Sequence, residues 1–400
     1  MPVQREAEAL AAAGYETEVI CMRDPKRPRR YVLNGVDITS LPVRLRKTST
    51  LRQLYEYLAF GFMAGATLAG RHLRRRYAAV QINTMPDFLV FVAAIPKALG
   101  ARVLIHMKEP SPELADVIFG RRLVVSVFER LEQQALRFAD HALTVTEPLK
   151  RRYVERGADP NRITVVLNGA APESQLAGWS PGEHREEGFT LICHGTFEDR
   201  YGHDTIVDAV SLLRDEFPDL QVVFTGRGST MASIDAKAAD LGLNAMVRNE
   251  GWVSRARVND LLAAADVGVV AQKASSYSHL VHTNKMMEYW MFGLPVINSR
   301  LRATEELYDD SVLEYFVPGD VRSLAAAIRR LREDPKRRAE LARNGERALE
   351  RHGWPAQRLV YLSVYERVLE GVRPVWGLLA GLVASFVLVA SFAWAFEAVP

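Results

Sequence analysis

Short apolar runs alternate with amphipathic stretches along most of the chain. In the first half, runs that fit β-strands cover residues 15–22, 77–83, 101–106, 142–145 and 162–167. In the second half, such runs cover residues 190–194, 221–225, 247–250, 267–270 and 296–298. Helical stretches separate them, for example at 88–99, 123–139, 204–215 and 234–241. Strands that alternate with helices are typical of parallel sheets, so we predict an α/β fold.

The length of 400 residues indicates two or three domains. Residues 172–188 are rich in Pro, Gly, Ser and charged side chains, which is typical of a linker. We therefore predict one α/β domain over residues 1–171 and a second over residues 189–355. A helix over residues 356–371 is expected to return to the first domain.

The beginning of the chain does not follow the usual order of a doubly wound sheet. Residues 4–13 have a helical pattern that Gly14 stops, and the strand 15–22 follows. In such a sheet the first strand is central and its glycine turn faces the ligand. Because the helix comes first here, we expect the first strand to be missing, either upstream or through truncation. Its neighbours would be left unpaired and the chain poorly stable.

Residues 375–396 form a long apolar run without a charged side chain. About 20 apolar residues suffice to cross a bilayer as a helix. Trp376 and Trp394 lie near the ends of the run and Arg373 precedes it, as expected for membrane interfaces. We predict a C-terminal transmembrane helix that holds the globular part at the cytoplasmic face of the cell membrane. The alternative is a buried helix of a large core.

A second apolar segment lies in the first half. Residues 51–76 fit one long helix, with an apolar stretch at 59–69 and a basic cluster at 71–76. The pattern fits an interfacial helix that faces anionic lipid. It fits a core helix with a solvated basic end equally well.

The overall composition is that of an ordinary globular chain, with 48% hydrophobic and 25% charged residues. The formal net charge of +3 is too small to indicate a nucleic-acid partner. Cys21 and Cys193 are the only cysteines and lie in different predicted domains. We interpret them as buried thiols in a reducing compartment, and expect no disulfide and no zinc site.

Residues 283–299 read T-N-K-M-M-E-Y-W-M-F-G-L-P-V-I-N-S and contain the most informative polar pair. Lys285 and Glu288 are three residues apart, so the ammonium and the carboxylate lie on one face of a helix. The Gly-Leu-Pro that follows ends this helix and begins a strand. The pair therefore lies at the carboxyl edge of a sheet, where doubly wound folds bind ligands. An ordinary surface ion pair before a helix stop is the alternative.

Glycines follow two of the predicted strands in the second half. Gly195 follows the strand 190–194, and Gly226 and Gly228 follow the strand 221–225. Glycine allows the backbone N–H groups to approach an anion closely, and the guanidinium of Arg200 can bind phosphate through two hydrogen bonds. Together these features suit a pyrophosphate. The alternative is a surface loop with a solvated arginine.

These motifs resemble the retaining glycosyltransferases of the GT-B fold, described as group 1 or family 4-like, over residues 139–353. The resemblance implies two Rossmann-like domains that face a cleft. It implies that Arg200 and Lys285 are catalytic contacts of the donor diphosphate and that Glu288 holds the ribose hydroxyls. The other donor-binding residues that it implies are Gly195, Gly226, Gly228, Val253, Thr283 and Asn284.

The chain departs from this family pattern at one position. Many members have a first glutamate eight residues before the ribose-binding one, and here that position is Leu280, with His279 and His282 nearby. A retaining transfer mainly needs a stabilised leaving diphosphate and an acceptor held on the same face. The loss of this glutamate therefore does not exclude catalysis.

A candidate site in the first half follows the strand 101–106. The sequence H-M-K-E-P at residues 106–110 resembles the family's H-x-H-E-P loop, with Lys108 where a histidine is usual. The resemblance implies that His106 and Glu109 are catalytic residues that contact the sugar or the acceptor. The alternative is the first turn of a helix, where the helix dipole favours acidic side chains such as Glu113.

We therefore expect a hexosyltransferase that moves a sugar from a nucleotide-diphosphate sugar to a lipid-linked or polysaccharide acceptor, with retention, in envelope, exopolysaccharide or glycolipid synthesis. The first domain would bind the acceptor and the second the nucleotide sugar, and closure of the cleft would assemble the site. No metal or other cofactor is expected, because the chain has no Asp-x-Asp sequence and no zinc-like spacing. The alternatives are a nucleotide-sugar epimerase of the same architecture and a membrane-tethered donor-binding scaffold without catalysis.

Overall fold

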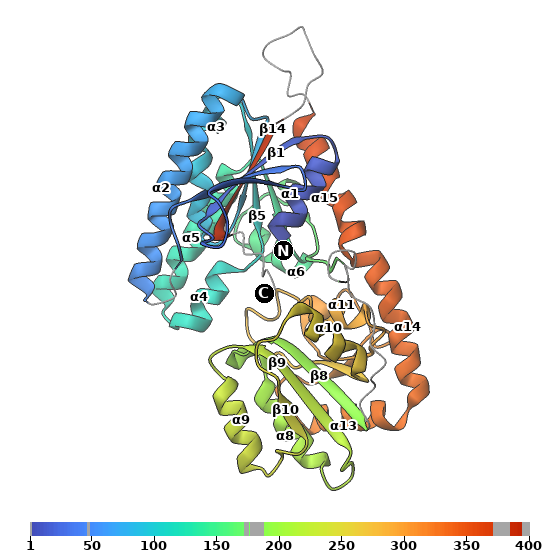
Figure 1. Ribbon diagram of the computed structural model, residues 1–400. Helices are drawn as coiled ribbons and strands as arrows, with labels where there is room; N and C mark the ends of the chain where they lie inside the picture. Colours follow the sequence, from blue (N-terminus) through green and yellow to red (C-terminus); the bar gives the residue numbers. More distant parts are fainter. Residues whose placement is uncertain (1, 46–48, 172–175, 177–187, 371–384, 394–400) are drawn as a thin grey trace. The chain divides into compact units, whose positions relative to one another are not determined.

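The computed structural model describes residues 2–45, 49–171, 176, 188–370 and 385–393. The chain forms two compact units (Figure 1). The first unit combines Met1–Leu167 with Gln357–Ala398, and the second contains Asn168–Ala356. Residues 172–188, predicted to be a linker, lie almost entirely outside the described residues. Each unit is built around a sheet of mainly parallel strands, which confirms the predicted α/β class.

The first unit contains an eight-stranded sheet with the order β2-β3-β1-β14-β4-β5-β6-β7. Its strands are β1 (Glu16–Met22), β2 (Arg30–Leu33), β3 (Val36–Leu41), β4 (Ala79–Asn83), β5 (Arg102–Met107), β6 (His141–Thr144), β7 (Ile163–Val165) and β14 (Ser385–Ala393). Its helices are α1 (Pro2–Ala12), α2 (Thr50–Arg75), η1 (Asp87–Ala93), α3 (Ala94–Ala98), α4 (Ser111–Phe119), α5 (Arg122–Phe138), α6 (Glu147–Glu155), η2 (Pro160–Arg162) and α15 (Trp354–Leu369). Neighbouring strands are parallel, except that β2 and β3 form an antiparallel pair.

The strand β14 lies at the centre of this sheet, and Figure 1 shows it in red among blue and cyan strands. It pairs in parallel with β1, where Val19 is opposite Leu388, and with β4, where Gln81 is opposite the same leucine. Val387, Leu388 and Val389 are fully buried. The C-terminal apolar run thus fills the position of the missing first strand. The expectation that β1 and β4 lack a partner is wrong.

The predicted transmembrane helix over residues 375–396 is also wrong. Residues 385–393 form a strand, and the described part of the chain contains no helix that is both long enough and apolar enough to span a bilayer. Residues 375–384 and 394–396 of the predicted helix lie outside the described residues. An uncharged run of valine, alanine, leucine and phenylalanine also suits a parallel strand that is buried on both faces, and its hydrophobicity does not distinguish the two structures.

The second unit contains a six-stranded parallel sheet with the order β10-β9-β8-β11-β12-β13. Its strands are β8 (Phe189–Thr196), β9 (Leu220–Arg227), β10 (Val247–Asn249), β11 (Val267–Val270), β12 (Val296–Ser299) and β13 (Glu314–Phe316). Its helices are η3 (Asp199–Tyr201), α8 (His203–Leu213), α9 (Met231–Asp240), α10 (Arg255–Ala264), α11 (Lys285–Trp290), α12 (Arg302–Glu305), α13 (Val321–Glu333) and α14 (Pro335–His352). All the described strand pairs are parallel.

Both faces of this second sheet are buried, because successive side chains of a strand point to opposite faces. On β8, Leu191 and Cys193 pack in the same cluster as apolar residues of α8, α9 and α13. Ile192 packs in the other cluster, which contains apolar residues of α10 and α11. The sheet is therefore a fixed platform, and the loops at its carboxyl edge carry the polar residues.

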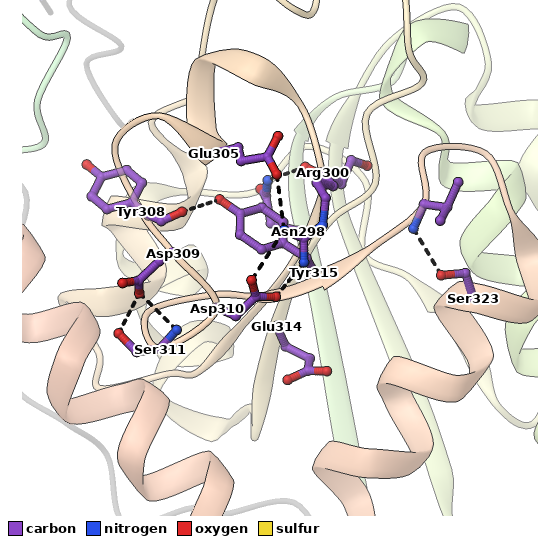
Figure 2. A network of polar contacts seen from close by, with 12 residues as sticks. Asn298, Arg300, Glu305, Tyr308, Asp309, Asp310, Ser311, Glu314, Tyr315 and Ser323 are labelled. Carbon is purple, nitrogen blue, oxygen red and sulfur yellow. Dashed lines mark hydrogen bonds and ion pairs between the residues drawn. The ribbon is translucent and has the colours of Figure 1, made fainter.

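A polar network fastens the segment after β12 to β13 (Figure 2). Arg300 donates to Glu305 at 3.2 Å and to Asp310 at 3.3 Å. The hydroxyl of Tyr315 on β13 donates to the carbonyl of Tyr308 at 2.7 Å. These contacts tie the segment between the last two strands to the edge of the sheet.

We expect Leu388→Ala to lower the free energy of unfolding by roughly 2–5 kcal/mol, the usual cost of truncating a fully buried leucine. Leu359→Ala is the matched control, because Leu359 lies on α15 of the same unit and is 65% exposed. Urea unfolding followed by circular dichroism measures both variants. If Leu388→Ala is as mild as the control, β14 is not the central strand.

Candidate active site

The carboxyl end of β8 is a glycine turn that lies against a lysine. Gly195 has a φ of +114°, which favours glycine, and a Cβ atom there would lie 2.8 Å from Cε of Lys285. A Cβ atom on Gly226 would overlap the carbonyl oxygen of Gly195, and one on Gly228 would overlap the carbonyl oxygen of Phe197. At the three predicted glycines the ends of β8 and β9 therefore lie close to each other, and Gly195 also lies close to the lysine.

Two cations face one tyrosine ring beside this turn. The Nζ atom of Lys285 lies 4.4 Å from the ring centroid of Tyr201, and Cζ of Arg200 lies 5.0 Å from the same centroid. The short helix η3 carries both Arg200 and Tyr201. Among the described residues, the ammonium of Lys285 takes part in no ion pair. The structure therefore brings Gly195, Arg200 and Lys285 together at an edge of positive charge.

Glu288 lies one helical turn after Lys285 on α11, and its carboxylate is held by two basic side chains. Its Oε2 atom is 3.0 Å from Nε2 of His194 and accepts a hydrogen bond from Nη1 of Arg255 at 3.2 Å. Burial by itself raises the pKa of Glu288, but the hydrogen bonds and charges of His194 and Arg255 outweigh burial and lower it to about 2. In the described part of the chain, its Oε1 atom has no hydrogen-bond partner. The carboxylate is thus ionised, oriented and able to accept further hydrogen bonds.

Thr283 and Asn284 begin the helix that carries this pair. The backbone N–H of Lys285 donates to Oγ1 of Thr283 at 3.3 Å, and the backbone N–H of Glu288 donates to the carbonyl of Asn284 at 3.0 Å. Both residues fix the first turn of α11. Their predicted contacts with a donor stay a prediction.

The loop after β10 lies next to the glycine of β9. The backbone N–H of Gly226 donates to the carbonyl of Gly251 at 2.8 Å. Trp252 is 51% exposed and stacks under Arg227, whose Cζ is 4.3 Å from the ring centroid. Val253 is partly buried against the apolar cluster beneath the sheet. The backbone of this loop is therefore fixed beside the glycine turn, while its tryptophan faces solvent.

Leu280, which replaces the family's first glutamate, is buried. Its neighbour His279 accepts a hydrogen bond from the backbone N–H of Arg302 at 3.3 Å. His282 is buried too, and burial lowers its pKa to about 4 although a hydrogen bond to Thr283 acts in the opposite direction. The two histidines do not supply a carboxylate in place of the missing one.

In the first unit, His106 lies near the carboxyl end of β5, beside two charged side chains. Glu6 of α1 accepts from Nζ of Lys108 at 2.7 Å and lies 3.1 Å from Nδ1 of His106. Its second oxygen accepts from Nε2 of Gln81 at 2.7 Å. Burial alone raises the pKa of Glu6, but Lys108 and His106 outweigh burial and lower it to about 2. Burial lowers the pKa of His106, so a neutral imidazole is held between the glutamate and the sheet.

Helix α15 completes this cluster. The hydroxyls of Tyr361 and Tyr365 donate to Oε1 of Gln81 at 2.9 and 2.6 Å. Glu6 and Gln81 were missed in the sequence because they belong to no motif. The one signal was Lys108, since a buried ammonium needs an acidic partner.

The two glutamates after His106 have different surroundings. Glu113 is buried on α4 and pairs with Arg156 at 2.8 Å and Arg152 at 3.3 Å, so it supports the fold of the first unit. Glu109 is half-buried, and its charge raises the pKa of Lys108 while burial, the larger effect, lowers it. Glu109 thus stays a candidate site residue.

The fold and these features define a two-unit α/β protein with a glycine turn and cations at a strand end. Residues 3–169 match the family described as "Glycosyl transferase 4-like domain", and residues 188–334 match "Glycosyl transferases group 1". Together the two matches cover most of the chain. The chain thus combines a glycosyl transferase 4-like region with a group 1 glycosyl transferase region, and these matches support a transferase enzyme.

Curated relatives include lipopolysaccharide core biosynthesis glycosyltransferase LpsE of Rhizobium meliloti, 31% identical over 40% of this chain and 44% of the relative. D-inositol 3-phosphate glycosyltransferase of Thermobispora bispora is 28% identical over 66% of this chain and 61% of the relative. The chain therefore spans about half to three-fifths of these two proteins. Phosphatidyl-myo-inositol mannosyltransferase of Mycolicibacterium smegmatis is 25% identical over 90% of this chain and 88% of the relative.

Solved structures share the fold. Sucrose-phosphate synthase from Thermosynechococcus elongatus has a TM-score of 0.73 at 19% identity and covers 92% of this chain and 93% of its own. HepE of Anabaena, solved in complex with UDP and glucose, has a TM-score of 0.67 at 16% identity and covers 92% of this chain and 97% of its own. These similarities support the predicted GT-B architecture.

We expect the free energy of unfolding to fall less steeply with decreasing pH in Glu288→Gln than in wild type. The pKa of Glu288 is lowered from 4.5 to about 2 in the folded chain, so its carboxylate stabilises the fold above pH 4.5 and loses this effect as the pH falls toward 2. Between about pH 5 and pH 3 the contribution shrinks by roughly 2 kcal/mol, at about 1.4 kcal/mol per pKa unit.

Urea midpoints measured over this range should therefore converge for wild type and Glu288→Gln as the pH falls. Glu333→Gln is the control, because it removes the same charge from an exposed position on α13. If the urea midpoint falls equally steeply between pH 5 and pH 3 in all three proteins, Glu288 is not held by His194 and Arg255.

Proposed function

We propose that the chain transfers a hexose from a nucleotide-diphosphate sugar to a lipid-linked acceptor, with retention of anomeric configuration. One observation carries the proposal: the glycine turn at Gly195 lies against Lys285, and both Lys285 and Arg200 lie over the ring of Tyr201. Backbone N–H groups at a strand end and two nearby cations together suit a diphosphate.

The cations act on the leaving group. Breaking the sugar–phosphate bond places negative charge on the departing diphosphate, and fixed positive groups stabilise that charge in the transition state. Arg200 and Lys285 supply such groups without a metal ion, so the proposed transfer persists when divalent metals are chelated. The fold shared with HepE, which was solved with UDP and glucose, supports a nucleotide donor.

Glu288 takes the ribose of the donor. Its ionised carboxylate is oriented by His194 and Arg255 through Oε2, which leaves Oε1 to accept from a hydroxyl. The loop of Gly251 and Val253 is fixed beside the glycine turn and presents its backbone to the nucleobase.

The acceptor side belongs to the first unit, where Glu6 pairs with Lys108 and lies 3.1 Å from Nδ1 of His106, and burial lowers the pKa of this histidine. A neutral imidazole can orient an acceptor hydroxyl and share its proton. The names of the relatives, a lipopolysaccharide core transferase and a phosphatidyl-myo-inositol mannosyltransferase, favour a glycolipid or envelope lipid as acceptor. The buried thiols of Cys21 and Cys193 suit the reducing, cytoplasmic side of the membrane.

Two measurements test the proposal. Calorimetry with UDP, GDP and ADP identifies the nucleotide, and the full chain is then incubated with the matching labelled sugar nucleotide and a lipid extract, with and without a chelator. We expect label in the lipid fraction, and nuclear magnetic resonance of the product shows whether the donor's anomeric configuration is kept. Nucleotide binding without any transfer would favour a donor-binding scaffold, and interconversion of the free donor would favour an epimerase.

For Lys285→Ala and Arg200→Ala we expect turnover to fall by at least about tenfold, equivalent to about 1.4 kcal/mol of barrier, because each cation acts mainly in the transition state. Donor KM should change less than kcat. Lys336→Ala is the control, since Lys336 is exposed on α14. Turnover within about twofold of wild type for both site variants would remove this pair from the mechanism.

A further inference from the structure

The loop between β11 and α11 packs against the short helix η3 in the second unit. The backbone N–H of Lys273 in this loop donates to the carbonyl of Arg200 at 2.9 Å. Gly202 follows η3 with a φ of +64°, and a Cβ atom there would overlap the carbonyl oxygen of Ala271. These main-chain contacts hold η3 against the loop, and they do not depend on the side chain of Lys273.

The side chain of Lys273 adds contacts on both sides of Arg200 in the sequence. Its Nζ atom donates to Oδ1 of Asp199 at 2.8 Å and to Oδ2 of Asp204 at 2.9 Å. Asp199 lies on η3, and Asp204 lies in the first turn of α8. Burial by itself lowers the pKa of Lys273, but the hydrogen bonds and charges of the two aspartates outweigh burial and raise it. One ammonium group thus pairs with two carboxylates.

These charges act on the same buried imidazole as the lysine of α11. Burial, the largest effect, lowers the pKa of His203; Lys285 and Lys273 lower it as well, Asp204 raises it, and the result is about 3. The histidine is therefore neutral near pH 7 and adds no charge of its own. Asp204 and Lys273 belong to the same electrostatic surroundings as Lys285.

The balance of charge in this cluster depends on Lys273. Arg200 and Lys285, which both lie over one tyrosine ring, are the cations that the proposed function places at a diphosphate. The charges of Asp199 and Asp204 would cancel those of these two cations, and Lys273 makes the cluster positive. Like charges repel, so a carboxylate without a cationic partner opposes the binding of an anion nearby.

We propose that Lys273 is a positioning residue of the donor site, whose ammonium neutralises Asp199 and Asp204 so that a diphosphate can approach Arg200 and Lys285. The inference rests on the proposed function, because it concerns the same diphosphate site. Exposed ion pairs contribute little to stability, so the effect of Lys273 is expected on ligand binding and not on folding. Asp199 is 81% exposed, so dissolved salt screens its charge and weakens the effect.

The test is calorimetry of the full chain with whichever of UDP, GDP and ADP binds, and with the matching nucleoside, measured by competition. We expect Lys273→Met to weaken diphosphate binding at least about fivefold at low salt and less at high salt, and to leave nucleoside binding unchanged. The carboxylates repel the bound and the departing diphosphate alike, so the variant should raise donor KM more than it lowers kcat. Circular dichroism checks that the variant keeps the fold.

A rescue experiment separates charge from structure. The variant Lys273→Met/Asp199→Asn/Asp204→Asn lacks the ammonium and both carboxylates, so we expect it to bind the diphosphate at least as tightly as wild type does. Lys273→Arg keeps the positive charge and should also bind as wild type does. If the triple variant binds as weakly as Lys273→Met, the contact geometry of the lysine matters and not its charge, and the proposal is overturned. Equal losses of nucleoside and diphosphate binding would overturn it as well.

Lys237→Met is the matched control. Lys237 of α9 pairs with Asp208 of α8 at 2.5 Å, and its side chain is 32% exposed, against 30% for Lys273. We expect this control to bind the diphosphate as wild type does. If wild type transfers sugar while Lys273→Met binds and turns over as wild type does, only the inference about Lys273 fails. If wild type binds none of the three nucleotides, the proposed function fails and this inference fails with it.

Discussion

A strand inside a parallel sheet needs hydrogen-bonding neighbours on both edges, and in the first unit this condition depends on β14. Buried backbone groups without partners cost about 1–3 kcal/mol each. β14 supplies the partners of both β1 and β4, so the two halves of the sheet are joined through it. β4 and β5 carry Gln81 and His106, and the geometry of the polar cluster around Glu6 therefore depends on the same strand.

The second unit meets a different constraint at its site, namely the close approach of two strand ends and the side chain of Lys285. Gly195 and Gly226 allow β8 and β9 to come together and Lys285 to lie over them. Because Gly195 has no Cβ atom, the side chain of Lys285 can lie against the backbone of the turn. His194, one residue before the turn, then orients Glu288 on the same helix as the lysine. One short helix and one strand end thus set the positions of both charges.

The sequence predicts most of this second unit because its signals are local. The glycines follow apolar strands directly, and Lys285 and Glu288 are three residues apart on a helix that Gly293 ends. The contacts that hold those residues are not local: His194 and Glu288 are 94 residues apart, and Glu6 and Lys108 are 102 apart. A single sequence contains no spacing rule for such pairs. The misinterpretation of residues 375–396 has a related cause, because hydrophobicity alone does not separate a buried strand from a membrane helix.

The position of β14 also bears on how the protein is made. The described residues of the second unit all lie within Asn168–Ala356, whereas the first unit combines Met1–Leu167 with Gln357–Ala398. During synthesis from the N-terminus, the second unit can fold as soon as it leaves the ribosome. Until β14 is made, β1 and β4 each have one edge whose backbone N–H and C=O groups are unpaired, and such edges can pair incorrectly with other strands. The part of the chain that contains β1 and β4 is therefore synthesised before the second unit, but its sheet is completed only after β14 has been made.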